Sequence, residues 1–221
     1  MTGEELTLAT SITDCLDRRR GSLTDIIRVV ASVMNTVLLQ PTCMMAVPII
    51  YAHWEGFTKE CLQLYVEHLE AIALPQGDAS SALLAYAWEG SFAKLRDKLT
   101  HAKKEELVDR FFASLDTALV FEKKQREIDT KSNLSFKVLE ELAQAFCLDI
   151  APLRAHKTNL DALVNRRNNI AHGGRDQAMD DNDVARYRDL AVTLMTELES
   201  ILLDALSKQT YRRPEPERAT A

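Results

Sequence analysis

The chain has 221 residues, of which 46% are hydrophobic and 27% charged, so it can form one compact domain, or at most two, around a real apolar core. This composition excludes disorder and a fibre as the main state. Seven glycines and six prolines are few for this length, whereas a fold of strands and tight turns needs many of both. The sequence therefore predicts an all-α protein.

The charge balance excludes a general affinity for nucleic acid. Lysine and arginine number 27 against 33 acidic residues, a formal net charge of −6, so any contact with a phosphate backbone must be local. No stretch reaches the roughly 18 apolar residues of a membrane span, and the N-terminus does not resemble a signal peptide. We expect a cytoplasmic protein, with four separate cysteines that form neither a disulfide framework nor a zinc site.

Helical spacing of apolar residues begins near the N-terminus. The pattern predicts helices over 4–20 and 22–39, separated at Gly21-Ser22, with Ser22 as an N-cap. Pro41 marks the next break. The strongest pattern covers 44–72 and predicts a central helix, in which Pro48 must occupy the first turn or cause a kink.

The middle of the chain is more broken. Residues 74–78 have the composition of a turn, two shorter helices follow to about Leu99, and a charged helix is expected from Lys103 to Ile128. The polar segment 130–135 offers cap candidates in Ser132, Asn133 and Ser135 for a short amphipathic helix.

The last third of the chain carries clear start and stop signals. A helix over 161–171 should end at Gly173-Gly174, and residues 180–183 should cap a long final helix through Leu206. We therefore expect a single helical bundle of about seven to eight helices over residues 1–207, with an N-terminal extension (1–40), a core (41–207) and a disordered tail (208–221).

One segment, residues 163–174, has a composition unlike that of a scaffold helix. Two arginines, three amides, a histidine and two glycines lie within ten of its residues: Asn165, Arg166, Arg167, Asn168, Asn169, His172, Gly173 and Gly174. Around it, from Ala151 to Leu190, seven basic residues stand against six acidic ones, a net charge of +1. This balance suits a small cleft that meets a few phosphates, and not an extended RNA track.

Together with Asn133-Leu134 and the run Tyr51-Ala52-His53-Trp54-Glu55-Gly56-Phe57, this segment resembles the HEPN superfamily of small helical proteins, particularly bacterial members with a Trp-Glu-Gly-Phe helix. The nuclease members of that superfamily carry an arginine, four to six residues and then a histidine. Arg167 and His172 match with four residues between them, and Asn168 fills the polar position after the arginine. Arg166 also matches, with five residues between it and His172, but another arginine follows it, so we prefer Arg167 as the motif residue and keep Arg166 as the alternative.

The resemblance implies a ribonuclease that needs no metal or other cofactor. RNA supplies its own nucleophile, the 2′-hydroxyl, so His172 would act as acid and base, and Arg167 would stabilise charge on the phosphate. Asn168 would orient His172 or hydrogen-bond the phosphate. Arg166, Asn169, Asn133 and Glu55 are further candidates for substrate binding. No set of His, Cys and acidic residues has the spacing of metal ligands, so no metal is expected.

Helix geometry raises a question about this pair. Residues five apart lie about 140° apart around a regular helix and about 7.5 Å apart along it, so Arg167 and His172 do not share a face. Either the helix breaks near Ala171, or a second copy of the chain completes the site about a twofold axis. Composite sites of this kind are common in HEPN nucleases, so the resemblance favours a homodimer.

Simpler interpretations remain for most of these residues. Arg167 and His172 can be basic residues at a helix C-terminus, and Glu55 can pair with Lys59 one turn later. Bacterial proteins with this motif are often toxins or antiviral effectors, which implies an antitoxin or a sensor as partner. The alternative is a non-catalytic helical module that binds nucleotide, RNA or a partner protein.

Overall fold

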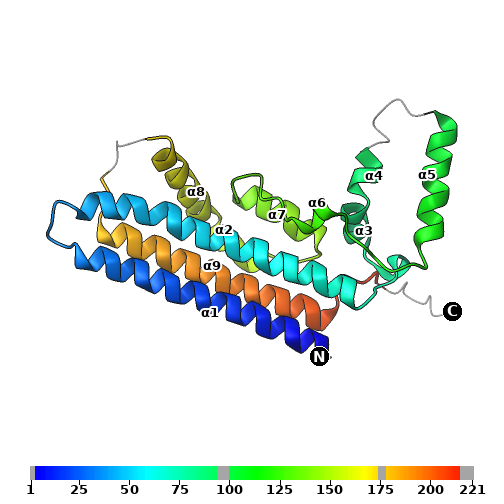
Figure 1. The fold of residues 1–221 in the computed structure, drawn as a ribbon, viewed down its shortest axis with the longest axis horizontal. Helices are drawn as coiled ribbons and strands as arrows, with labels where there is room; N and C mark the ends of the chain where they lie inside the picture. Colours follow the sequence, from blue (N-terminus) through cyan, green and yellow to red (C-terminus); the bar gives the residue numbers. More distant parts are fainter. Residues whose placement is uncertain (1–2, 94–99, 174–177, 215–221) are drawn as a thin grey trace.

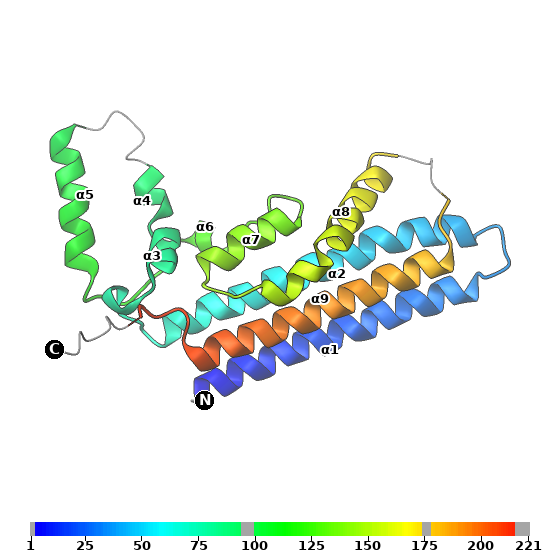
Figure 2. The same cartoon turned by 180° about the vertical axis from the view of Figure 1, so that it is seen from behind.

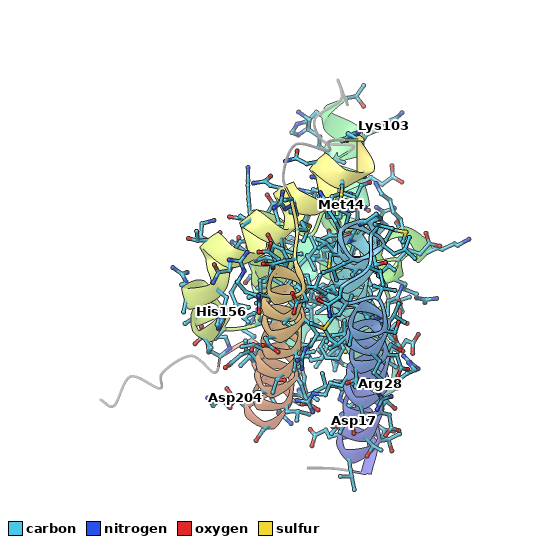
Figure 3. The ribbon with its side chains drawn as sticks, turned by 90° about the vertical axis from the view of Figure 1, so that its left-hand side faces the viewer. Asp17, Arg28, Met44, Lys103, His156 and Asp204 are labelled. Atoms are coloured by element: carbon cyan, nitrogen blue, oxygen red, sulfur yellow. The ribbon has the colours of Figure 1, made fainter. Side chains whose placement is uncertain are left out.

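The computed structural model describes residues 3–93, 100–173 and 178–214 (Figure 1). Over these ranges the chain forms nine α-helices and no β-strand, which confirms the all-α class. Three long helices, α1 (Gly3–Ser32), α2 (Leu39–Ala71) and α9 (Asp181–Lys208), lie side by side, and the remaining elements stand on one side of this layer (Figures 1 and 2). Figure 3 looks along the long helices and shows side chains filling the space between α1 and α9.

The first helix differs from the expectation. Helix α1 runs through Gly21 without a break, and the Ser22 hydroxyl donates a hydrogen bond to the carbonyl of Arg18 within the helix, so Ser22 is not an N-cap. A mid-helix glycine costs only about 1 kcal/mol. The buried side chains Leu8, Ile12, Leu16 and Leu23 hold α1 against α2 and α9 on both sides of that position. Tertiary packing therefore outweighs the local break signal.

Helix α2 is the central helix that the pattern predicted, although it begins five residues earlier than expected. It contains both Pro41 and Pro48. Pro41 lies in the first turn, where a missing N–H costs little because the helix has no carbonyl four residues earlier to accept it. Trp54, Phe57, Cys61 and Tyr65 are fully buried along its length.

An arm of short helices follows α2. Helices α3 (Ser81–Ala87) and α4 (Glu89–Ala93) match the two short helices expected before Leu99, as far as the described residues reach. The single charged helix expected from Lys103 to Ile128 is wrong. Helix α5 (His101–Ser114) ends near the middle of the expected range, and α6 covers only Lys123–Arg126. Between them the chain pairs with residues 74–77 through hydrogen bonds such as that from Leu119 N–H to the Leu74 carbonyl (2.7 Å).

The remaining elements bring the chain back to the long layer. Helix α7 (Phe136–Ala145) is followed by a 3-10 helix (Ala151–His156) and by α8 (Lys157–Ala171), which packs against α2. As expected, Ser135 caps α7, since its hydroxyl accepts the N–H of Val138. Asp180 caps α9, where its carboxylate accepts the N–H of Asp183.

The C-terminal residues that follow α9 are not a loose tail over their whole length. Tyr211 is buried, its carbonyl accepts the N–H of Ser80 (2.8 Å), and Arg213 N–H donates to the carbonyl of Asp78 (2.7 Å). An aromatic side chain between α2 and the 78–80 segment anchors this stretch, a feature that the charged and proline-rich sequence obscured. Residues 215–221 of the expected tail lie outside the described residues.

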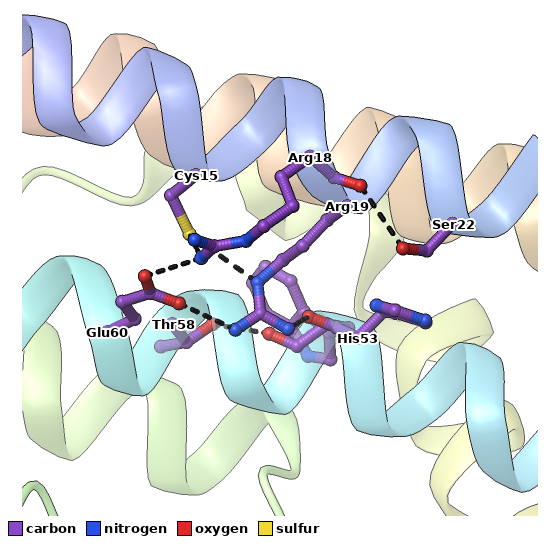
Figure 4. Close-up of polar contacts among 8 residues, drawn as sticks. Cys15, Arg18, Arg19, Ser22, His53, Thr58 and Glu60 are labelled. Atoms are coloured by element: carbon purple, nitrogen blue, oxygen red, sulfur yellow. Dashed lines mark hydrogen bonds and ion pairs between the residues drawn. The ribbon is translucent and has the colours of Figure 1, made fainter.

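Helices α1 and α2 are joined by a polar cluster (Figure 4). Arg18 and Arg19 both donate to the carboxylate of Glu60, and Arg19 also donates to the carbonyl of His53 (3.2 Å). Burial alone would raise the pKa of Glu60, but the hydrogen bonds from the two arginines outweigh it and lower the pKa to about 2. Gly56 leaves room for this arrangement, since a Cβ there would lie 2.8 Å from Nη1 of Arg19.

None of the helices in the described ranges is long and apolar enough to cross a membrane.

Candidate active site

Helix α8 presents the polar segment at its C-terminal end. Leu160, Leu163 and Val164 are buried and fix the first part of the helix. The helix ends at Ala171, His172 is the C-cap, and Gly173 adopts a left-handed backbone (φ 79°), as the glycine signal predicted. Gly174 lies outside the described residues.

Arg167 is held by contacts on three sides. Its Nη1 donates hydrogen bonds to Oδ1 of Asn133 (3.2 Å) and to Oδ1 of Asn168 (2.8 Å). Its Cζ lies 5.1 Å from the ring centroid of Tyr51 on α2, the geometry of a cation–π contact. A half-buried guanidinium with its direction fixed in this way is suited to meet an anion such as phosphate.

The segment 130–135 brings Asn133 to this position. The Leu134 N–H donates to the Tyr51 hydroxyl (2.6 Å), and the Thr130 hydroxyl donates to the Glu55 carboxylate. Burial raises the pKa of Tyr51 to about 12, so its hydroxyl keeps its proton at neutral pH. Asn133 itself does not cap helix α7, and neither does Ser132, because Ser135 fills that role.

Glu55 is engaged within the protein. Besides the contact with Thr130, its carboxylate lies 3.4 Å from Lys59 one turn later, as the simpler interpretation of the sequence predicted. Glu55 therefore ties α2 to the 130–135 segment. Its neighbours in the motif serve packing, since Trp54 and Phe57 are buried and Gly56 accommodates Arg19.

His172 lies apart from Arg167. Its backbone N–H still bonds to the Asn168 carbonyl (3.0 Å), so the chain follows the helical path up to this residue, and its side chain is exposed. Five residues on such a path leave the two side chains about 140° apart. Among the described residues no hydrogen bond joins them, so the end of α8 does not close the pair within one chain.

The other expected residues take different positions on α8. Asn168 orients Arg167 through its side chain, Arg166 is half-buried, and Asn169 is exposed. Sequence reasoning included Tyr51 in the run that carries the resemblance but gave neither Tyr51 nor Thr130 a role, although Tyr51 precedes Glu55 by one helical turn, which was a usable signal. In the described parts of the chain, no group of three or more His, Cys, Asp and Glu residues is placed to hold a metal ion.

Comparison with known families identifies the chain. The sequence model of the RiboL-PSP-HEPN family matches residues 16–204. The chain belongs to this family. The match runs from Leu16 in α1 to Asp204 in α9 and confirms the resemblance to the HEPN superfamily. No curated protein and no solved structure matches it.

Proposed function

We propose that this HEPN protein is a metal-independent endoribonuclease whose site contains Arg167 and His172. HEPN domains are in general ribonuclease-like. The observation that carries the proposal is the fixed orientation of the Arg167 guanidinium, which contacts Asn133, Asn168 and Tyr51. An exposed histidine, His172, follows Arg167 five residues later. An arginine that only complemented the helix dipole would need no such set of contacts.

The chemistry follows from the residue types. His172 takes the proton of the RNA 2′-hydroxyl or gives one to the leaving 5′-oxygen. Arg167 stabilises the charge that builds on the phosphate, and Asn133 and Asn168 keep it in one direction. The products are a 2′,3′-cyclic phosphate and a 5′-hydroxyl. In this proposal Arg166 and Asn169, which lie on the same end of α8, contact flanking phosphates.

The proposal includes a homodimer. Six large apolar side chains are exposed on the end of α1, in the following turn and on the first part of α2: Val29, Met34, Val37, Leu38, Met45 and Ile49. Figures 1 and 2 place this turn at the same end of the long helices as the C-terminal part of α8. Exposed apolar side chains gathered in one region favour an interface. A second copy covering that region would bring a second α8 end to the first.

A toxin or an antiviral effector is the role that the resemblance to bacterial proteins with this motif favours. Such an enzyme would need a neutralising or activating partner, and its expression alone would arrest growth. A non-catalytic module that binds RNA, nucleotide or a protein would leave growth unaffected, which separates the two functions in one culture experiment.

The direct test compares cleavage of total RNA by the wild type with that by Arg167→Ala and His172→Ala. We expect each variant to lose about two to four orders of magnitude in rate, because one removes charge stabilisation and the other the proton carrier. Arg154→Ala and His101→Ala are matched controls, since both replace exposed residues of the same types outside α8. Near-normal cleavage by folded His172→Ala would overturn the catalytic assignment.

A mixing experiment tests the composite site. Combining Arg167→Ala chains with His172→Ala chains produces heterodimers, in which one site regains both an arginine and a histidine if each site draws on two chains. We expect activity to return on mixing. A fully active monomer in light scattering at the assay concentration would reject the dimer.

A further inference from the structure

Tyr51 contacts Arg167 and also Leu134, the residue next to the Arg167 acceptor Asn133. Its ring lies beneath the Arg167 guanidinium, with 5.1 Å between Cζ and the ring centroid. Its hydroxyl accepts the N–H of Leu134 (2.6 Å), the residue that follows Asn133 in the chain. Tyr51 is itself buried within α2, one turn before Glu55. The Tyr51 side chain therefore contacts both the Arg167 guanidinium and the segment that carries its hydrogen-bond acceptor, Asn133.

The segment that carries Asn133 needs such an anchor. Lys131 and Ser132 both have left-handed backbone conformations (φ 52° and 61°), which residues with a side chain rarely adopt. Contacts outside the segment must hold this geometry. Two of them come from α2, where Glu55 accepts the Thr130 hydroxyl and Tyr51 accepts the buried Leu134 amide.

We propose that Tyr51 is a positioning residue of the ribonuclease site, which aligns Arg167 through its ring and Asn133 through its hydroxyl. The inference rests on the proposed function for its effect on catalysis, but the alignment itself can be measured without any activity. A leucine at position 51 fills the buried space and offers neither a ring face nor an acceptor. A phenylalanine keeps the ring and removes only the acceptor, so the two roles separate.

The experiment combines side-chain NMR with RNA cleavage on the full chain. The heteronuclear NOE of Arg167 Nε–Hε, assigned by its absence in Arg167→Lys, reports whether the guanidinium is fixed. We expect the NOE to show a rigid Arg167 side chain in the wild type and in Tyr51→Phe, and a mobile one in Tyr51→Leu. In Tyr51→Phe the side-chain amide of Asn133 should become mobile instead. Tyr65→Phe is the matched control, because Tyr65 is equally buried on α2 and contacts Phe146 and Tyr211.

Cleavage kinetics provide the second readout. Because the arginine acts on charge that develops during the reaction, we expect kcat to fall at least about tenfold in Tyr51→Leu while KM changes little. Tyr51→Phe should lose about threefold in kcat, because a displaced Asn133 misaligns Arg167 less than the loss of the aromatic ring does. Tyr65→Phe should match the wild type in both readouts.

Each outcome decides the matter. A folded Tyr51→Leu protein in which Arg167 stays rigid overturns the inference. If Tyr51→Leu does not fold, Tyr51→Phe decides, and an unchanged Asn133 amide together with unchanged kcat overturns it. If the wild type cleaves no RNA, the proposed function fails, and the NMR data alone then confirm or reject the positioning by Tyr51.

Discussion

Replacing Gly56 by alanine tests how firmly Arg19 is held between α1 and α2. A methyl group at this position would lie 2.8, 3.0 and 3.2 Å from Nη1, Nη2 and Cζ of Arg19. The guanidinium has little freedom to move, because the Arg19 side chain is only 16% exposed and is bonded to Glu60 (2.8 Å) and to the His53 carbonyl (3.2 Å). The substitution must therefore displace a bonded cation.

The expected magnitude follows from three opposing effects. Alanine stabilises a helix interior by about 1 kcal/mol relative to glycine. Loss of hydrogen bonds from a charged group costs about 1.5–3 kcal/mol, and forcing a methyl into a filled space costs about 1–3 kcal/mol. The two costs overlap, since the movement that relieves the clash also breaks the bonds. We expect a net destabilisation of about 1–2 kcal/mol.

Gly21→Ala is the matched control. Gly21 lies in the interior of α1, and a Cβ there would meet no atom within 4 Å. The same substitution should therefore stabilise the protein by about 0.5–1 kcal/mol. Urea denaturation followed by circular dichroism measures both free energies of unfolding. If Gly56→Ala proves as stable as Gly21→Ala, Arg19 is not fixed in the way its contacts indicate.

Three further predictions concern the site and the α1–α2 cluster. Asn133→Ala removes an acceptor from Arg167 and should slow RNA cleavage about tenfold, whereas Asn159→Ala, an exposed asparagine at the start of α8, should leave the rate unchanged. EDTA should not inhibit cleavage, since the RNA 2′-hydroxyl needs no metal-bound water; loss of activity that one added metal restores would show a missed metal site. Because the pKa of Glu60 falls from 4.5 to about 2 on folding, its stabilising effect is complete above pH 4.5 and disappears toward pH 2. The difference in unfolding free energy between the wild type and Glu60→Gln should shrink over that range, and a constant difference would contradict the ion pair.

Much of the fold could be predicted because local signals agree with the tertiary structure. In the last third, Asp180 marks a helix start through its side-chain cap, Gly173 marks a helix end through its left-handed backbone, and the apolar periodicity of α9 faces the core. The expected helix over 103–128 failed for the opposite reason. Residues 115–119 pair with the 74–77 turn through hydrogen bonds to a distant segment, which periodicity along one stretch does not reveal.

The candidate site could be predicted only in part. The family resemblance indicated Asn133, and the structure brings it to Arg167. Tyr51 belongs to the run that carries the resemblance, but the sequence gave no reason to assign it a role beyond the core, and Tyr51 is indeed buried. Its second role arises from α8 crossing α2 above its ring, and one sequence carries no record of such a crossing.

The most direct test of the proposed chemistry uses an RNA oligonucleotide in which the nucleotide before a mapped cleavage position lacks its 2′-hydroxyl. If His172 activates that hydroxyl for attack on the phosphate, the wild-type protein should bind the modified RNA as well as the normal one, and cleavage at that position should disappear. The normal RNA should yield a 2′,3′-cyclic phosphate. Continued cleavage at the 2′-deoxy position would mean that water is the nucleophile, and would contradict the mechanism assigned to Arg167 and His172.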